Sequence, residues 1–187
     1  MDITYGTEEW EKAYQEMVKE RLAKVEKPYV MGSPEWVAVF EKNIQEDDTY
    51  KEVAKTWEGT VVINILGNPE IGLDEDTFMM MDLWHGDCRS IRLVPREAGE
   101  KGDYVLTGEF ERWESVLKRE LDVVKAMMQG KIKLKGSLPD IVRYVKASIR
   151  LVELGAQIET RFQTEMTEDE RADFRKWFNE LRSQFGF

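Results

Sequence analysis

The only histidine and the only cysteine of the chain lie close together, in the stretch His85-Gly86-Asp87-Cys88. A Cys–His pair could do nucleophilic chemistry, and His85 with Asp82 and Asp87 could bind a metal ion. The first needs a third group that orients the base, and the second needs a further histidine, which the chain lacks. A tight turn between two strands is also held at the surface, open to water. We therefore interpret this stretch as a turn that needs Gly86 and Asp87, and we expect no catalytic residue, metal or cofactor.

Composition favours one globular domain. The chain has 187 residues, of which 42% are hydrophobic, enough for a core of its own. A formal net charge of −10 repels phosphate backbones and argues against a nucleic-acid partner. Six basic residues and one acidic residue nevertheless lie between Lys131 and Arg150. This segment could attract anionic headgroups, although lysines along a sheet edge more often prevent aggregation.

No targeting or membrane-spanning segment is expected. The first ten residues lack a basic region followed by an apolar core, and charged residues interrupt every apolar run well before the roughly 20 residues that span a bilayer. The final Phe185-Gly186-Phe187 is not a peroxisomal signal. A single cysteine cannot form an intramolecular disulfide. These features predict a cytoplasmic protein.

Helical spacing of apolar residues indicates several helices. We expect them over residues 7–26, in a bent pair between 33 and 59, over 112–129, over 137–162 and over 168–184. Ser33 followed by Pro34 is a strong helix start, and Thr167 with Glu170 forms a capping box.

Extended patterns predict five strands, the first from residue 60 up to Gly67 and the others over residues 77–84, 89–94, 103–106 and 131–135. The first four are joined by short loops, as an antiparallel meander requires. The strand over 77–84 is apolar on both faces, and Phe78, Met80 and Trp84 share one of them. This face could line a cavity, because methionine adapts to ligands of varying shape. A core strand buried on both faces is the alternative.

The stretch over residues 104–136 resembles a known family. A strand ending at Thr107-Gly108, a helix bearing Trp113, an apolar run before Gly130, and Lys131-x-Lys133-x-x-Gly136 together are similar to the sterol carrier protein family. The resemblance extends over about residues 33–162. It implies an α+β domain whose mostly antiparallel five-stranded sheet is covered by helices around an apolar tunnel. Members of that family carry lipids and are not enzymes.

This resemblance sets the expected organisation and function. Residues 1–30 would be an N-terminal helical extension, and residues 31–187 a lipid-binding domain that ends in an amphipathic helix. The expected function is binding or transfer of an apolar small molecule, such as a fatty acyl chain, an acyl-CoA, a sterol-like lipid or an isoprenoid. The expected contact residues are Phe78, Met80, Trp84, Trp113, Met127, Met128, Ile141, Phe174, Trp177 and Phe178.

Other interpretations stay open. The chain could be an oligomerisation or scaffold module whose aromatic terminal helices bury a partner and whose cavity is filled by its own side chains. A small-molecule enzyme that uses His85 and Cys88 is a further alternative. The terminal helix could pack as core or cover the mouth of the tunnel. A homodimer and a transient contact with a membrane surface are also open.

Overall fold

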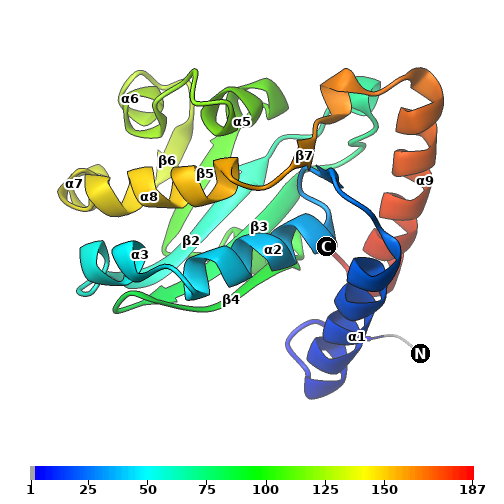
Figure 1. Cartoon of the computed structure of the whole chain (residues 1–187), viewed down its shortest axis with the longest axis horizontal. Coiled ribbons are helices and arrows are strands. Elements are labelled where there is room, and N and C mark those ends of the chain that lie inside the picture. The colour runs from blue at the N-terminus through cyan, green and yellow to red at the C-terminus, as the bar shows by residue number, and fades with distance from the viewer. Residues whose placement is uncertain (1–2) are drawn as a thin grey trace.

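The computed structural model describes residues 3–187, and a five-stranded sheet lies at its centre (Figure 1). The strand order is β4-β3-β2-β5-β6. The strands are β2 (Glu58–Ile65), β3 (Thr77–Trp84), β4 (Asp87–Val94), β5 (Tyr104–Gly108) and β6 (Lys133–Lys135). Neighbouring strands are antiparallel except β2 and β5, which are parallel. The predicted α+β fold with a five-stranded, mostly antiparallel sheet is confirmed.

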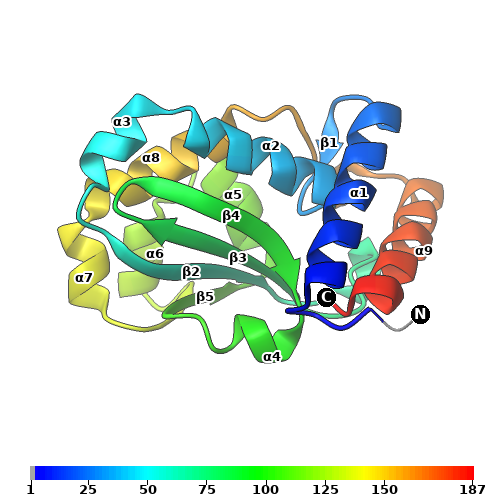
Figure 2. The ribbon, with the colours of Figure 1, turned by 90° about the horizontal axis from the view of Figure 1, so that it is seen from below.

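The parallel pair corrects the expectation of a simple meander among the first four strands. After the β3–β4 hairpin, the chain passes through α4 (Arg96–Gly99), which lies against the outer face of the sheet (Figure 2). This connection carries the chain past β3, so that β5 pairs with β2 on the side away from the hairpin. A parallel pair needs such a crossover, and sequence spacing alone did not reveal it.

A layer of helices covers the other face of the sheet (Figure 2). They are α2 (Pro34–Gln45), α3 (Asp48–Val53), α5 (Phe110–Leu117), α6 (Val123–Met128), α7 (Leu138–Arg143) and α8 (Val145–Ala156). Short elements complete the chain: β1 (Tyr29–Val30) pairs with β7 (Thr160–Arg161), and η1 (Pro69–Ile71) and η2 (Gln163–Glu165) are single turns. Within residues 3–187, no helix has both the length and the apolar character needed to span a membrane.

Two segments predicted as single helices are broken in the structure. Residues 112–129 divide into α5 and α6, because Arg119 adopts a left-handed conformation (φ 63°) and Asp122 caps a new helix by accepting from the backbone N–H of Lys125 at 2.9 Å. Asp and Asn compete in this way with continued helix formation. Residues 137–162 divide into α7 and α8 at Tyr144. The predicted caps at Ser33 and Thr167 are present.

The terminal helices α1 (Glu8–Lys24) and α9 (Glu168–Phe185) pack side by side at one end of the sheet (Figure 1). The Trp10 indole N–H donates to the backbone oxygen of Phe185 at 2.8 Å, and the ring of Tyr14 stacks on Trp10. Arg21 binds Glu35 of α2 through two hydrogen bonds, at 2.6 and 3.0 Å, and lies over the ring of Trp177. The two terminal helices are therefore fixed to each other and to the domain.

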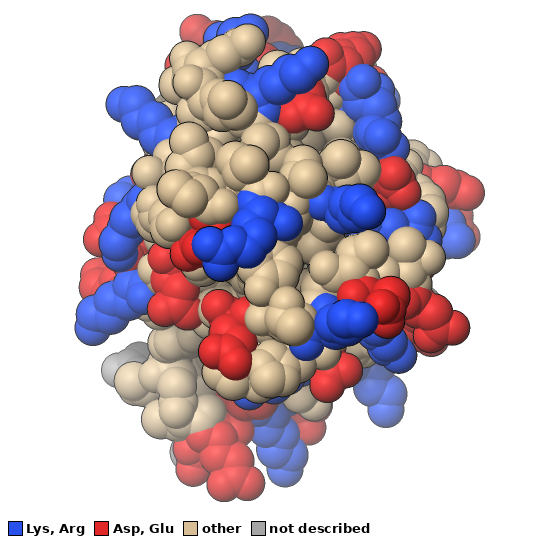
Figure 3. All heavy atoms as spheres, turned by 90° about the vertical axis from the view of Figure 1, so that its left-hand side faces the viewer, with Lys and Arg blue, Asp and Glu red and all other residues tan. Residues whose placement is uncertain are grey.

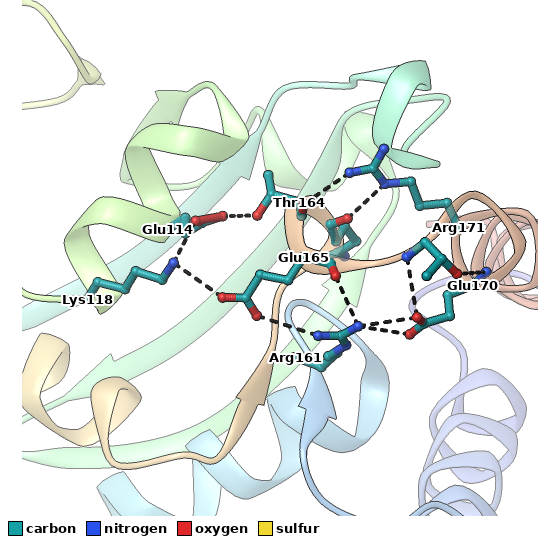
Figure 4. A network of polar contacts seen from close by, with 9 residues as sticks. Glu114, Lys118, Arg161, Thr164, Glu165, Glu170 and Arg171 are labelled. Carbon is teal, nitrogen blue, oxygen red and sulfur yellow. Dashed lines mark hydrogen bonds and ion pairs between the residues drawn. The ribbon is translucent and has the colours of Figure 1, made fainter.

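A charged network joins α5 to the segment that leads into α9 (Figure 4). Lys118 contacts Glu114 at 3.0 Å and Glu165 at 3.4 Å, and Arg161 contacts Glu170 at 3.0 Å. These side chains all keep some contact with water. The network positions the chain between β7 and α9, and its pairs are of the surface kind that contribute little individually.

Candidate ligand cavity

An apolar cavity of about 120 Å³ lies between the sheet and its covering helices. Its sheet wall comes from β2, β3, β4 and β5, through Val61, Ile63, Ile65, Thr77, Met79, Met81, Leu83, Leu93 and Leu106. On β3, every second residue from Thr77 onward lines the cavity, because alternate side chains of a strand point to the same face of the sheet.

The helix wall comes from α2, α3, α5, α6, α7 and α8. It includes Trp36, Phe40, Tyr50, Trp113, Val116, Leu117, Val123, Met127, Ile141, Tyr144, Ala147, Ser148, Leu151 and Val152, with Met31, Gly32 and Trp57 from the connecting segments. Within the described residues 3–187, no charged side chain lines the cavity. Such a lining favours burial of an apolar ligand over stabilisation of a developing charge.

Two polar side chains at the wall, Thr77 and Tyr144, form hydrogen bonds within the protein. The Thr77 hydroxyl accepts a hydrogen bond from the Arg182 guanidinium at 2.6 Å. The Tyr144 hydroxyl lies 2.9 Å from the Thr56 hydroxyl and donates to the Thr56 backbone oxygen at 3.1 Å. Burial raises the pKa of the Tyr50 phenol above its ordinary value, so this group stays protonated.

The volume sets a limit on what fits without rearrangement. An engineered cavity of about 150 Å³ in another protein holds one benzene molecule, whereas pockets for drug-sized ligands are about 300–1,000 Å³. The cavity of about 120 Å³ therefore accommodates a short apolar group. A longer chain needs the walls to move apart.

Three of the expected contact residues line this cavity: Trp113, Met127 and Ile141. Trp113 is fixed by a hydrogen bond of 3.3 Å from its indole N–H to the backbone oxygen of Asn64 on β2. Ile141 and Met127 come from the short helices α7 and α6. The structure thus brings together residues that are far apart in the sequence, and their role in binding stays a prediction.

Phe78 and Met80 require a correction, because they lie on the opposite face of β3. Phe78 belongs to a separate outer cluster with Val62, Val94 and Val105, and Met80 packs against that cluster. α4 comes so close to this face that a side chain at Gly99 would collide with the Phe78 ring. Both faces of β3 are covered by apolar groups, so its composition did not indicate which face bounds the cavity.

Trp84 and Met128 also lie outside the cavity. Trp84, at the end of β3, is 40% exposed; its ring stacks on His85 and lies near the Arg89 guanidinium. Met128, the last residue of α6, is 65% exposed. Each belongs to an apolar sequence pattern but lies at an end of its element, where the covering layer stops.

The α9 residues pack into the main hydrophobic core at the end of the sheet where α1 lies. Phe174 and Phe178 are each 2% exposed, and their rings stack with centroids 5.1 Å apart. Trp177 packs under Arg21 of α1. Phe174 also closes on the loop before β3, where it leaves little room beside Gly72. None of the three lines the cavity.

The sequence reasoning missed much of the wall. Trp36 and Phe40 on α2 could have been found, because they are four residues apart on the apolar stripe that Ser33 and Pro34 begin. Leu106 lies within a strand that the pattern located correctly. Tyr144 and Ser148 gave no apolar signal, and only the packing of α8 reveals them.

His85 and Cys88 are not arranged as a catalytic pair. The His85 imidazole forms a hydrogen bond of 2.7 Å with the Glu58 carboxylate, and the His85 side chain is half-exposed. Cys88 is buried, and burial raises the pKa of its thiol to about 12. A thiol that stays protonated is a poor nucleophile. Among the described residues, no group of three His, Cys, Asp or Glu side chains is placed to hold a metal ion.

Comparison with known proteins gives a consistent result. A family model described as the SCP-2 sterol transfer family matches residues 40–145. A crystal structure of sterol carrier protein 2 is 28% identical, with a TM-score of 0.64, over 68% of this chain and 98% of that chain. The solution structure of a conserved hypothetical protein from Thermus thermophilus, described as possibly a sterol carrier protein, is 26% identical, with a TM-score of 0.65, over 73% of this chain and 94% of that chain. A comparison with curated proteins gave no match.

Proposed function

This chain belongs to the SCP-2 sterol transfer family, and from that membership and the apolar cavity we propose that it binds and transfers an apolar lipid-like molecule. The observation that carries the proposal is a cavity wall without charge, built from both the sheet and the helices. The ligand classes that suit this wall are a fatty acyl chain, the acyl part of an acyl-CoA, a sterol-like lipid and an isoprenoid.

The wall favours loose chemical selectivity. Met31, Met79, Met81 and Met127 contribute unbranched, polarisable side chains that adapt to different shapes. Each methylene transferred from water contributes about 0.8 kcal/mol, and the cost of ordering the ligand offsets part of the gain. Micromolar affinity, on the order of 8 kcal/mol, is the expected range for a chain of moderate length.

A long chain requires the cavity to widen into a tunnel. α6 and α7 are six-residue helices, and the positive φ angles of Gly130 and Gly136 bound the segment between them. Short elements with few internal hydrogen bonds open at low cost compared with the sheet. We therefore assign the widening to movement of α6 and α7 away from β5 and β2.

The terminal helices α1 and α9 bear on the choice between the carrier function and the oligomerisation alternative. We also propose that residues 1–30 are an N-terminal extension of the lipid-binding domain, because α1, like α9, lies outside the residues that the family model matches. Their aromatic residues Trp10, Tyr14, Phe174 and Phe178 are buried within the chain itself. This burial leaves the oligomerisation alternative with less aromatic surface for a partner.

The direct test is binding of a fluorescent fatty acid to the purified protein, combined with native mass spectrometry. We expect one saturable site, displacement by unlabelled fatty acids of several lengths, and a retained apolar ligand in the mass spectrum. Absence of both saturable binding and a retained ligand would remove the carrier function. A higher oligomer without ligand would favour the scaffold alternative.

A further inference from the structure

One end of the molecule exposes apolar side chains that the cavity does not use. Among residues 3–187, the exposed large hydrophobic residues are Leu22, Trp84, Met128, Val142 and Ile149. The last three come from α6, α7 and α8, which Figure 1 shows at the end of the sheet opposite to α1 and α9. The surface of these three helices is called the α6–α8 face below.

This face adjoins the ligand cavity. A surface hollow of about 430 Å³ lies between the α5–α6 connection and α8. Arg119 and Lys125 line it together with Glu120, Asp122 and Ile149. Val123 and Val152 line both the hollow and the cavity. Because each of these side chains borders both spaces, the wall is only one side chain thick at this place. It is a short route between the cavity and the surface.

The charge of this region differs from that of the whole chain. Residues 119–150 hold eight basic and three acidic residues, a net charge of +5, in a chain whose total is −10. Arg119, Lys125 and Lys146 are exposed, and none of them has an ion pair within the described residues. Figure 3 views this end of the molecule and shows Lys and Arg across its middle, among uncharged surface and some Asp and Glu.

We propose that the α6–α8 face docks on an anionic membrane surface, and that ligand passes between the bilayer and the cavity beside Val123 and Val152. The inference rests on the proposed function, since it names the surface that would supply and receive the ligand. Exposed apolar residues bordered by lysines and arginines suit the boundary between headgroups and acyl chains. The acidic remainder of the chain is repelled by the same surface and orients the molecule.

The two other exposed hydrophobic residues lie on other elements. Leu22 lies on α1, whose residues 8–24 include five acidic and four basic side chains. Trp84 lies beside the carboxylates of Asp82 and Asp87 on the β3–β4 hairpin. Each of these two stands alone as an exposed hydrophobic residue on its element, whereas the α6–α8 face holds three of the five, and we therefore assign docking to this face.

The test is sedimentation of the full chain with phosphatidylcholine vesicles, with and without phosphatidylglycerol. Wild-type protein should bind only the vesicles that contain phosphatidylglycerol, and added salt should weaken the binding. The charge variant Lys125→Glu with Lys146→Glu should bind at least about tenfold more weakly, because each basic residue near the surface contributes substantially. The apolar variant Met128→Ser with Ile149→Ser should also lose binding.

A matched control lies on α1, where Lys19→Glu with Leu22→Ser makes the same kinds of change and should leave vesicle binding unchanged. Fluorescent fatty acid binding without vesicles, measured for every variant, shows that the fold and cavity remain. Vesicle binding lost in the control but kept in the α6–α8 variants would overturn the inference. Equal binding to both vesicle types, or none with fatty acid binding intact, would also overturn it while the proposed function stands. Capture of another protein by this face in place of vesicles would contradict it too.

Discussion

Met79 and Met80 are adjacent on β3, yet they face opposite sides of the sheet. Met79 pairs with Ile63 on β2, and both side chains line the cavity. Met80 pairs with Val62 and lies with the outer cluster. Because the side chains of a strand alternate, a shift of one residue decides whether a methionine lines the cavity or packs in the outer layer.

This relationship gives a paired test of the cavity. Met79→Trp should fill the cavity and weaken fluorescent fatty acid binding by about tenfold or more, since loss of roughly two buried methylene contacts costs about 1.6 kcal/mol. Met80→Trp adds the same bulk on the outer face and should leave the affinity within about twofold of wild type. Equal effects on the two affinities would show that the cavity is not the ligand site.

The buried ion pair between Arg21 and Glu35 should be important for stability. Glu35 is fully buried, and Arg21 provides the charge that compensates it. Arg21→Met should lower the free energy of unfolding by about 3 kcal/mol, because it leaves a buried carboxylate unpaired. The double variant with Glu35→Gln should recover part of that loss. Urea denaturation measures both, and a double variant less stable than Arg21→Met would contradict this account.

Asp47 should make stability depend on pH in the acid range. The Arg150 guanidinium, which joins α8 to the start of α3, holds the pKa of the Asp47 carboxyl below its usual value. A lowered folded-state pKa contributes stability above the unfolded pKa of about 3.9, and that contribution is lost as the pH falls through the folded value.

Asp47→Asn is the matching variant, because asparagine keeps the helix cap and removes the charge. Wild type should be more stable than this variant near neutral pH, and the difference should shrink as the pH falls below about 4. Thermal unfolding across this range measures it. A difference that stays constant with pH would assign the effect of Asp47 to the cap alone.

His85 and Cys88 should be dispensable for ligand binding. The replacement of both by alanine is expected to leave fatty acid affinity unchanged, because neither residue lines the cavity. The raised thiol pKa, about 12, also predicts slow labelling of native protein by a thiol reagent at pH values near neutrality and fast labelling after unfolding. A large loss of binding in the double variant would revive the enzyme alternative.

Deletion of residues 167–187 should unfold the protein rather than leave a folded protein with a more open cavity. Phe174, Phe178 and Phe185 are each 2% exposed or less. Removal of one such side chain costs about 3 kcal/mol, so the three together approach the roughly 5–15 kcal/mol stability of a whole domain. Circular dichroism of the truncated chain measures the outcome. A folded truncated protein that releases fatty acid faster would instead support α9 as a cover.

Local sequence determined most of the secondary structure and the family. The caps at Ser33 and Thr167 and the turn at Gly86 depend on contacts within a few residues, which a sequence pattern can reveal. The pattern of Thr107-Gly108, Trp113 and Gly130 indicated the sterol carrier resemblance, and the matched family confirms it. Net charge and the local basic segment were also readable directly, since they are sums over residues.

Tertiary structure decided the place of β5 beside β2 and the face of β3 that bounds the cavity. Phe78 and Met79 are both apolar and both buried, so no property of the strand itself distinguishes inside from outside. The distinction comes from the layers packed on each side: α4 closes on Phe78, whereas Met79 lines the cavity together with residues of α5 and α8. Packing between segments distant in the sequence sets that difference, because a cavity is defined by the atoms that surround it.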